Sequence, residues 1–392
     1  ILAKCGGEIR NLSGAAEELY KFFKTDAEYS ERLKKVIESM KSPEPELLTR
    51  KNVRAIYGDV IALSATKLEK YNDCAFSYFM RYGLVAKERV SGKLDSRDTG
   101  SIQHNALYRY FSELKFNGAD YGEITYDRCR KRVCEIVEQA AKENSELLYE
   151  SSFYFKYIVS RMQGIVTRTA WETIKFYKSG AFRPYGYEIK IATGGDIPTI
   201  CIKADDGTDL AHLHGFIDRA DTAVINGKTY VSIIDYKSSK TDLDSALTDA
   251  GVKLQPLLYS DIVCKRLNAS PAAMLYMQMT DPIIKAENLK SDENSAVELA
   301  KSKEVDFGGW VNNDAAVIAN YSNGENGETF LPSKNHFMSE SEMTEHIEKA
   351  NENIKNAARG IYKGNISAKP FVCKGHSACT YCPYSLSCSK EE

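Results

Sequence analysis

Hydrophobic and polar positions change their spacing along the chain, which predicts a mainly helical half followed by a strand-rich half. In residues 8–41, Leu12, Leu19, Phe22 and Phe23 recur at helical spacing and share one face. From residue 184, strand-like runs such as "YGYEIKIA" and "TYVSIIDYK" are separated by turn residues. A last amphipathic pattern predicts a helix over 340–362. The expected fold class is therefore α/β (α+β).

Composition narrows the class of protein. The chain has 392 residues, of which 43% are hydrophobic, and this suffices for one large domain or two ordinary ones. No run reaches the length of a membrane span, and we expect a cytoplasmic protein. The first residue is Ile rather than Met, so we expect a piece of a longer polypeptide. A net charge of −2 means that any nucleic-acid contact must rest on a local patch.

Two acidic residues are predicted to meet across a hairpin. Asn226-Gly227 is a strong signal for a two-residue hairpin loop. Asp218 and Asp235 each lie eight residues from that loop, so they are expected to be directly opposite and on one face. A divalent cation, Mg²⁺ or Mn²⁺, would relieve their repulsion. Lys237 shares the face of Asp235, whereas Tyr236 points away and offers its carbonyl. The alternative is a solvent-exposed strand end with two incidental acids.

Further candidate residues carry weaker signals. His104 follows Gly100 in the first turn of a predicted helix, where an imidazole can bind a metal. Gln255 and Tyr259 are spaced to share one helical face, and Glu188 is an acid within a strand-like run. Taken alone, each of these patterns is more often structural than functional.

The cysteines predict a second metal centre. Ten cysteines without a secretory signal indicate a reducing compartment, where clustered thiols more often bind metal than form disulfides. "CTYCPYSLSC" supplies Cys379, Cys382 and Cys388, and Cys74 is the candidate fourth ligand. Spacing alone also allows zinc, with Cys373 or His376 as the fourth ligand. Because "NGKT" at 226–229 lacks the upstream glycine of a phosphate-binding loop, we expect no ATP hydrolysis by this stretch of chain.

Four motifs in order resemble the RecB-like branch of the PD-(D/E)XK nuclease superfamily. They are Gly100-x3-His104, "GFIDRAD", "IDYKSS" and Gln255-x3-Tyr259. The resemblance implies a restriction-endonuclease-like core, with a mixed central sheet flanked by helices and helical additions. It also implies metal ligation by His104, Asp218, Asp235 and the Tyr236 carbonyl, a catalytic Lys237, and support by Gln255 and Tyr259. Pro256 departs from the pattern and leaves the pose of Gln255 open.

Both ends of the chain resemble the B-type subunit family of bacterial ATP-dependent helicase/deoxyribonucleases (AddB-type). The segments concerned are "LSATKLEKYNDCAFSYFMRYGL" and the closing "CTYCPYSLSC". The resemblance implies a [4Fe-4S] cluster that joins the N- and C-terminal parts and is held by Cys74, Cys379, Cys382 and Cys388. Residues 1–50 would be a helical segment from a preceding domain, and 55–392 the nuclease domain.

The expected function is a Mg²⁺-dependent DNA exonuclease in a helicase–nuclease that processes double-strand breaks for recombinational repair. Expected partners are DNA, as double-strand ends and single strands, and the A-type subunit of the helicase–nuclease, with no membrane. One rival is a catalytically silent DNA-binding or scaffolding module of the same fold. A second rival is a stand-alone iron–sulfur nuclease acting on single-stranded ends.

Overall fold

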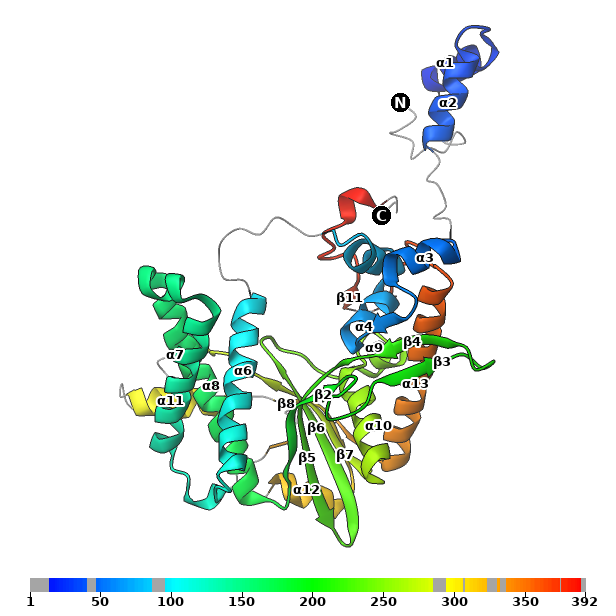
Figure 1. Cartoon of the computed structure of the whole chain (residues 1–392). Helices are drawn as coiled ribbons and strands as arrows, with labels where there is room; N and C mark the ends of the chain where they lie inside the picture. Colours follow the sequence, from blue (N-terminus) through cyan, green and yellow to red (C-terminus); the bar gives the residue numbers. More distant parts are fainter. Residues whose placement is uncertain are drawn as a thin grey trace.

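A six-stranded mixed sheet forms the centre of the protein (Figure 1). The computed structural model describes residues 14–40, 47–86, 96–284, 294–305, 307–322, 330–331, 336–373 and 375–388. The strand order is β2-β5-β6-β7-β8-β9. The strands are β2 (Arg183–Ile191), β5 (Gly215–Ile225), β6 (Lys228–Lys237), β7 (Ser270–Gln278), β8 (Phe307–Asn312) and β9 (Phe337–Met338). The β6–β7 and β8–β9 pairs are parallel and the other pairs antiparallel, which confirms the expected mixed sheet flanked by helices.

One face of the sheet is covered by long helices. These are α6 (Ser96–Phe116), α7 (Tyr126–Ser151) and α8 (Phe153–Ser179), with α11 (Asn294–Lys303) and α12 (Ala315–Ser322) nearby (Figure 1). Their buried side chains form one hydrophobic cluster with the sheet, in which Phe111, Tyr177 and Val311 are fully covered. This half of the core fixes α6, the helix that carries His104, against the sheet.

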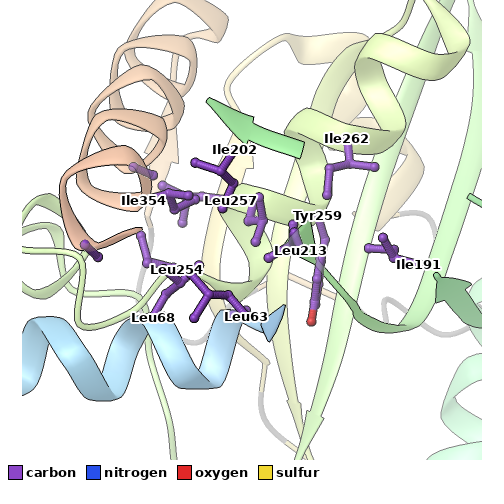
Figure 2. Close-up of a cluster of buried hydrophobic side chains, with 14 of the residues drawn as sticks. Leu63, Leu68, Ile191, Ile202, Leu213, Leu254, Leu257, Tyr259, Ile262 and Ile354 are labelled. Atoms are coloured by element: carbon purple, nitrogen blue, oxygen red, sulfur yellow. The ribbon is translucent and has the colours of Figure 1, made fainter. Parts of the chain in front are cut away.

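The opposite face packs against α10 and α13. These helices span Gln255–Leu267 and Glu340–Tyr362, and they are joined by α4 (Ala65–Asp73), α9 (Ser245–Asp249) and a small sheet. The small sheet has the order β1-β4-β3, with β1 (Ile61–Leu63), β3 (Ile200–Lys203) and β4 (Asp209–Leu213). Figure 2 shows how Leu63, Leu68, Leu257 and Ile354 from these elements meet in one buried cluster. The small sheet and α4 are thus part of the core beside α10.

The remaining elements lie toward the ends of the chain, except η4, which lies between α6 and α7. They are α1 (Ala15–Thr25), α2 (Ser30–Met40), α3 (Arg50–Tyr57), α5 (Ala75–Tyr78), η3 (Phe79–Gly83), η4 (Tyr121–Glu123), β10 (Val372–Cys373), β11 (His376–Ser377) and η7 (Ser385–Ser387). The helix predicted over 8–41 is two helices, because α1 ends at Thr25 and α2 begins at Ser30. Residues 8–13 and 41 of the predicted range lie outside the described residues. No α1 residue is buried. A separate domain for residues 1–50 stays a prediction. No helix of the described part could cross a membrane.

Local signals explain where several helices begin. The Ser64 hydroxyl accepts a hydrogen bond from the Lys67 amide at 3.3 Å and caps the start of α4. Ser339 and Glu342 form a reciprocal capping box at the start of α13, whose bounds coincide with the predicted 340–362. Pro256 occupies the first turn of α10, where its missing amide costs no helical hydrogen bond. Pro256, the residue that differs from the family motif, therefore lies where a helix begins.

The β5–β6 hairpin has the register that the sequence predicts. Asn226 and Gly227 both have positive φ, 52° and 79°, as a two-residue primed turn requires. Pairing runs without a shift from Ile225 opposite Lys228 to Arg219 opposite Ile234. The next residues in this register are Asp218 and Asp235. The predicted juxtaposition of the two acids is therefore confirmed at the level of the backbone.

Candidate active site

Three acids from three neighbouring strands lie at one level of the central sheet. Asp218 on β5 is flanked on β6 by Asp235, through the hairpin register. On the other side, Tyr187 pairs with Arg219 and Ile189 with Ile217, so Glu188 of β2 lies opposite Asp218. The sheet order β2-β5-β6 thus aligns three carboxylates. Three adjacent negative charges are unfavourable without a cation to balance them.

Glu188 sits on a strained stretch of backbone. Its φ of 47° lies in the left-handed region, which an L-residue with a long side chain rarely adopts within a strand. Such strain persists where the surrounding structure imposes it, and it is concentrated at functional sites. The kink leaves the Glu188 carboxylate 3.8 Å from the His104 imidazole. The strain therefore accompanies a contact at the acidic row, which is the line formed by Glu188, Asp218 and Asp235 across the three strands.

His104 joins the acids from helix α6. Its Nδ1 lies 3.5 Å from Asp218 Oδ2, and ligand atoms of His104, Glu188 and Asp218 all lie within 4.8 Å of one another. Burial opposes protonation of the imidazole. Hydrogen bonds and negative charge from Asp218 and Glu188 outweigh burial and raise the pKa of His104 to about 10. Without a metal, the histidine therefore carries the positive charge that balances the acids.

Asp235 is held in an environment that disfavours its charge. The residue is 3% exposed. Burial, and then the negative charge of Asp218, raise the pKa of Asp235 to about 7, although Lys237 and His104 pull it down. Lys237 Nζ lies 2.5 Å from Asp235 Oδ2. A buried carboxyl with so high a pKa, next to a second acid, is a feature of metal and catalytic sites.

The predicted supporting residues lie on α10. Gln255 Oε1 accepts a hydrogen bond from Lys237 Nζ at 2.7 Å, so the lysine is held between an acid and an amide. The Asp218 carboxylate accepts a hydrogen bond from the Tyr236 amide at 2.9 Å. Burial, and then the charges of Asp235 and Asp218, raise the pKa of Tyr259 well above its ordinary value. Gln255 and Tyr259 are thus brought to the acidic row, while the Tyr236 ring packs edge-on against His104.

Glu69 is a site residue that the sequence analysis missed. Its carboxylate accepts hydrogen bonds from the amides of Leu254 and Gln255, at 2.7 and 3.1 Å, and so caps α10. The positive charge of Lys237 lowers the pKa of Glu69, but burial, the largest influence, raises it overall. Because 185 residues separate Glu69 from Leu254, no local sequence signal points to this contact.

An open cleft leads to the acids. Its volume is about 830 Å³. It is lined by Gly100, Ser101, His104, Asn105, Tyr108, Glu188, Lys190, Asp196, Phe216 and Asp218. Tyr108 and Phe216 are large apolar side chains that stay 42% and 50% exposed within it. The cleft therefore offers polar groups at its base and aromatic surfaces on its walls.

The cysteine-rich tail returns to the end of α4. Phe371 N donates to Asp73 O at 2.7 Å, and His376 Nε2 lies 2.8 Å from Asp73 Oδ1. Burial, and then Cys382 and Cys388, raise the pKa of the Cys74 thiol, so these sulfurs are neighbours. The Cys382 amide donates a hydrogen bond to the Cys379 carbonyl at 3.2 Å, so these two cysteines belong to one turn. The structure thus places Cys74 near Cys382 and Cys388, while His376 contacts Asp73.

The chain matches a known family over most of its length. The PD-(D/E)XK nuclease superfamily matches residues 62–389. Similar proteins include the B-type subunit of the ATP-dependent helicase/deoxyribonuclease of Clostridium botulinum (strain Okra / Type B1), 28% identical over 98% of this chain and 34% of the relative. The protein of the same name from Caldanaerobacter subterraneus subsp. tengcongensis is 29% identical over 95% of this chain and 34% of its own length. The chain therefore spans about a third of these relatives. With its aligned acids and lysine, the chain belongs to the PD-(D/E)XK nuclease superfamily.

Proposed function

We propose that this chain is a metal-dependent deoxyribonuclease module of a helicase–nuclease that processes DNA double-strand breaks. The observation that carries the proposal is the convergence of Asp218, Asp235 and Lys237 with His104 at one level of the sheet. The relatives, which are named as B-type subunits of a helicase/deoxyribonuclease, support the same activity. Acids from adjacent strands with a neighbouring lysine suit phosphodiester hydrolysis, which needs a bound cation and a positioned water.

The donor set fits a hard divalent cation such as Mg²⁺ or Mn²⁺. His104, Asp218, Asp235 and the Tyr236 carbonyl would hold it, with Glu188 close enough to contribute. The set is dominated by oxygen, which Mg²⁺ prefers, and the histidine extends the choice to Mn²⁺. Burial and then the charge of Asp218 raise the pKa of Asp235, and Asp218 and Glu188 outweigh burial to raise the pKa of His104. The negative charge that contributes to both shifts is charge that a cation would balance. When bound, the cation supplies Lewis-acid activation of water and of the phosphate.

Lys237 is proposed as the residue that orients water and stabilises the phosphate. Burial disfavours its ammonium, but Asp235 and then Asp218 outweigh burial and raise the pKa of Lys237, so it stays charged. Gln255 holds the ammonium from the far side. A fixed positive charge beside the acids can stabilise the negative charge that develops on a phosphate during hydrolysis.

The cleft fits a nucleic-acid strand. Tyr108 and Phe216 present exposed rings on its walls, and bases stack on such rings without sequence preference. Lys190 lies in the same cleft and can contact a phosphate. Single strands, and the unwound ends of duplexes, are therefore the proposed substrates. The A-type subunit of the helicase–nuclease is the proposed partner that delivers them.

The tail cysteines are proposed to bind a [4Fe-4S] cluster with a structural role. Cys74, Cys379, Cys382 and Cys388 provide the four thiolates that such a cluster requires. A tetrahedral zinc site would bring sulfurs to within about 4 Å of one another, given a Zn–S distance of about 2.3 Å. The resemblance at Cys74 and the tail cysteines supports the iron–sulfur cluster over zinc, and metal analysis of the purified protein distinguishes the two. A cluster there would tie the tail to α4.

Two lysines of one strand provide the test of the nuclease proposal. Lys237→Ala should abolish degradation of linear DNA in Mg²⁺ or Mn²⁺, whereas Lys228→Ala should not. Lys228 begins the same strand but pairs with Glu340 on the surface, away from the acids. Asp235→Ala should also abolish activity while the circular dichroism spectrum stays unchanged. If Lys237→Ala or Asp235→Ala digests DNA at the wild-type rate, the assigned site is wrong.

A further inference from the structure

The β3–β4 hairpin carries a second group of metal-binding side chains, separate from the active site. Ligand atoms of Cys201, Asp209 and His212 all lie within 4.8 Å of one another. Cys201 is on β3, and the other two are on β4. The group contains a thiol and an imidazole, unlike the oxygen-rich row at the active site. It therefore suits a different kind of metal.

Strand geometry explains how the three side chains meet. Cys201 and His212 are direct partners across the antiparallel β3–β4 pair, so their side chains share a face. Asp209 is three residues before His212, and regular alternation would place it on the opposite face. The register shifts between Ile202 and Lys203, so Lys203 pairs with Asp209. A shift of this kind re-aims one side chain, and here it returns Asp209 to the face of His212.

Burial along the two strands supports this geometry. Leu210 and Ala211 are consecutive yet both buried, at 4% and 1% exposure, as expected where alternation is interrupted. Ile202 is also buried, whereas Asp209 is exposed and Cys201 and His212 are half-buried. The three candidate ligands thus lie on the outer face of the small sheet. A metal can reach them without opening the core.

Contacts within the group show that its polar atoms already interact. Partial burial, and then the Asp209 carboxylate, raise the pKa of the Cys201 thiol, which donates a hydrogen bond to that carboxylate. Lys203 Nζ lies 3.3 Å from Asp209 Oδ1 and holds the acid in place. The ring of His214, two residues beyond His212, lies 6.5 Å from the His212 ring and is not one of the three. The arrangement therefore consists of three convergent ligands.

We propose that Cys201, Asp209 and His212 bind Zn²⁺. Thiolate, imidazole and carboxylate are the three side-chain ligand types of protein zinc sites, and Zn²⁺ prefers four ligands in a tetrahedron. Three protein ligands leave one position for water. A thiolate and a carboxylate neutralise the two positive charges of the ion. Bound zinc fastens the edge strand β3 to β4, which continues through Gly215 into the strand that carries Asp218.

Cobalt spectroscopy on the full chain tests the site, because Co²⁺ takes the place of Zn²⁺ and a cobalt–thiolate bond gives a charge-transfer absorption band. The tail cysteines are proposed to bind metal as well, so the measurement is made in a background in which Cys379, Cys382 and Cys388 are all replaced by serine. We expect this protein to bind Co²⁺ with a thiolate band, and Zn²⁺ to displace it. Adding Cys201→Ser should remove the band, whereas adding Cys134→Ser, at a half-buried cysteine on α7, should not.

Asp209→Asn and His212→Ala, each added to the same background, give a second readout that leaves Cys201 in place. Loss of outer-shell partners alone costs a metal site about 10- to 100-fold in affinity, so loss of a direct ligand should weaken Zn²⁺ binding at least about 100-fold. His214→Ala should leave the affinity unchanged. A thiolate band that survives Cys201→Ser would overturn the proposal. Zinc affinity unaffected by both Asp209→Asn and His212→Ala in folded protein would overturn it as well.

Discussion

Asp235→Asn should stabilise the metal-free protein at neutral pH while it removes the response to Mg²⁺. In the folded protein the pKa of Asp235 is about 7, against an ordinary value of 3.8. The folded state thus holds this proton more tightly than the unfolded state does. Stability from the protonated carboxyl is therefore fully present below about pH 3.8 and is lost as the pH rises toward 7. An asparagine at this position does not titrate, so it avoids this loss.

The size of the effect follows from the same pKa difference. The two values differ by about three, and one pKa unit corresponds to about 1.36 kcal/mol, so the free energy of unfolding can fall by about 4 kcal/mol between pH 4 and 8. His104 also contributes, because its pKa of about 10 is raised from 6.5 and its stabilisation is lost as the pH rises through 10. His104 is present in both the wild type and Asp235→Asn. We therefore expect its contribution to the pH dependence of stability to be the same in both and to cancel in the difference.

Chemical denaturation in EDTA at pH 4.5 and pH 8 measures the difference. Asp235→Asn should exceed the free energy of unfolding of the wild type by about 1 kcal/mol at the lower pH and by about 4 kcal/mol at the higher pH. Mg²⁺ at one hundred times its dissociation constant should then stabilise the wild type by about 2.7 kcal/mol and the variant by much less.

Asp281 serves as a control, because its pKa is shifted in the opposite direction to that of Asp235. Burial raises the pKa of Asp281, but hydrogen bonds from Lys301 and Arg161 and the charges of Lys301 and Arg168 outweigh it, so the pKa is lowered. Asp281→Asn should therefore destabilise the protein at pH 8, where Asp235→Asn stabilises it. If Asp235→Asn and the wild type lose stability in parallel between pH 4.5 and 8 in EDTA, Asp235 does not have the environment described above. Equal stabilisation of both by Mg²⁺ would show that Asp235 is not a metal ligand.

Three further predictions address the lysine, the cleft and the tail. Lys237→Met should reduce the rate of DNA cleavage by orders of magnitude yet leave Mg²⁺ binding, measured by calorimetry, within a few fold. Phe216→Ala should weaken binding of single-stranded DNA in Ca²⁺ by about 1–3 kcal/mol, measured by fluorescence anisotropy, because one stacking surface is lost; an unchanged affinity would exclude stacking there. Cys74→Ser, purified without oxygen, should lack the brown colour and the iron and sulfide of the wild type, whereas a colourless wild type with one zinc would refute the cluster.

Local signals in the sequence predicted the hairpin, whereas contacts between distant segments were less accessible. Asn226-Gly227 fixes the loop, and the loop fixes which residues of β5 and β6 are opposite, so Asp218 and Asp235 follow from short-range rules. Glu188 was identified only as an acid in a strand. Its position beside Asp218 depends on the β2–β5 register, and β2 and β5 are separated along the chain by β3 and β4.

The β3–β4 group shows the same limit on a smaller scale. The strands around Cys201 and His212 are recognisable from "TICIKA" and "AHLHGFIDRADTAVI". Asp209 joins them only because the register shifts near Lys203, and a shift of one residue leaves no signal in an alternating pattern. Residue spacing alone would have placed Asp209 on the wrong face.

Helix α4 physically connects the tail cysteines to the lysine of the active site. Cys74 follows its last residue and lies near Cys382 and Cys388. Glu69, earlier on the same helix, accepts hydrogen bonds from the amides of Leu254 and Gln255. Those amides begin α10, and Gln255 in turn holds Lys237. A rigid helix transmits a displacement from one end to the other, so the proposed cluster at Cys74 would constrain where Gln255 presents its amide oxygen. The proposed cluster would need no contact with DNA to influence cleavage, because α4 carries both Cys74 and the cap of the helix that holds Lys237.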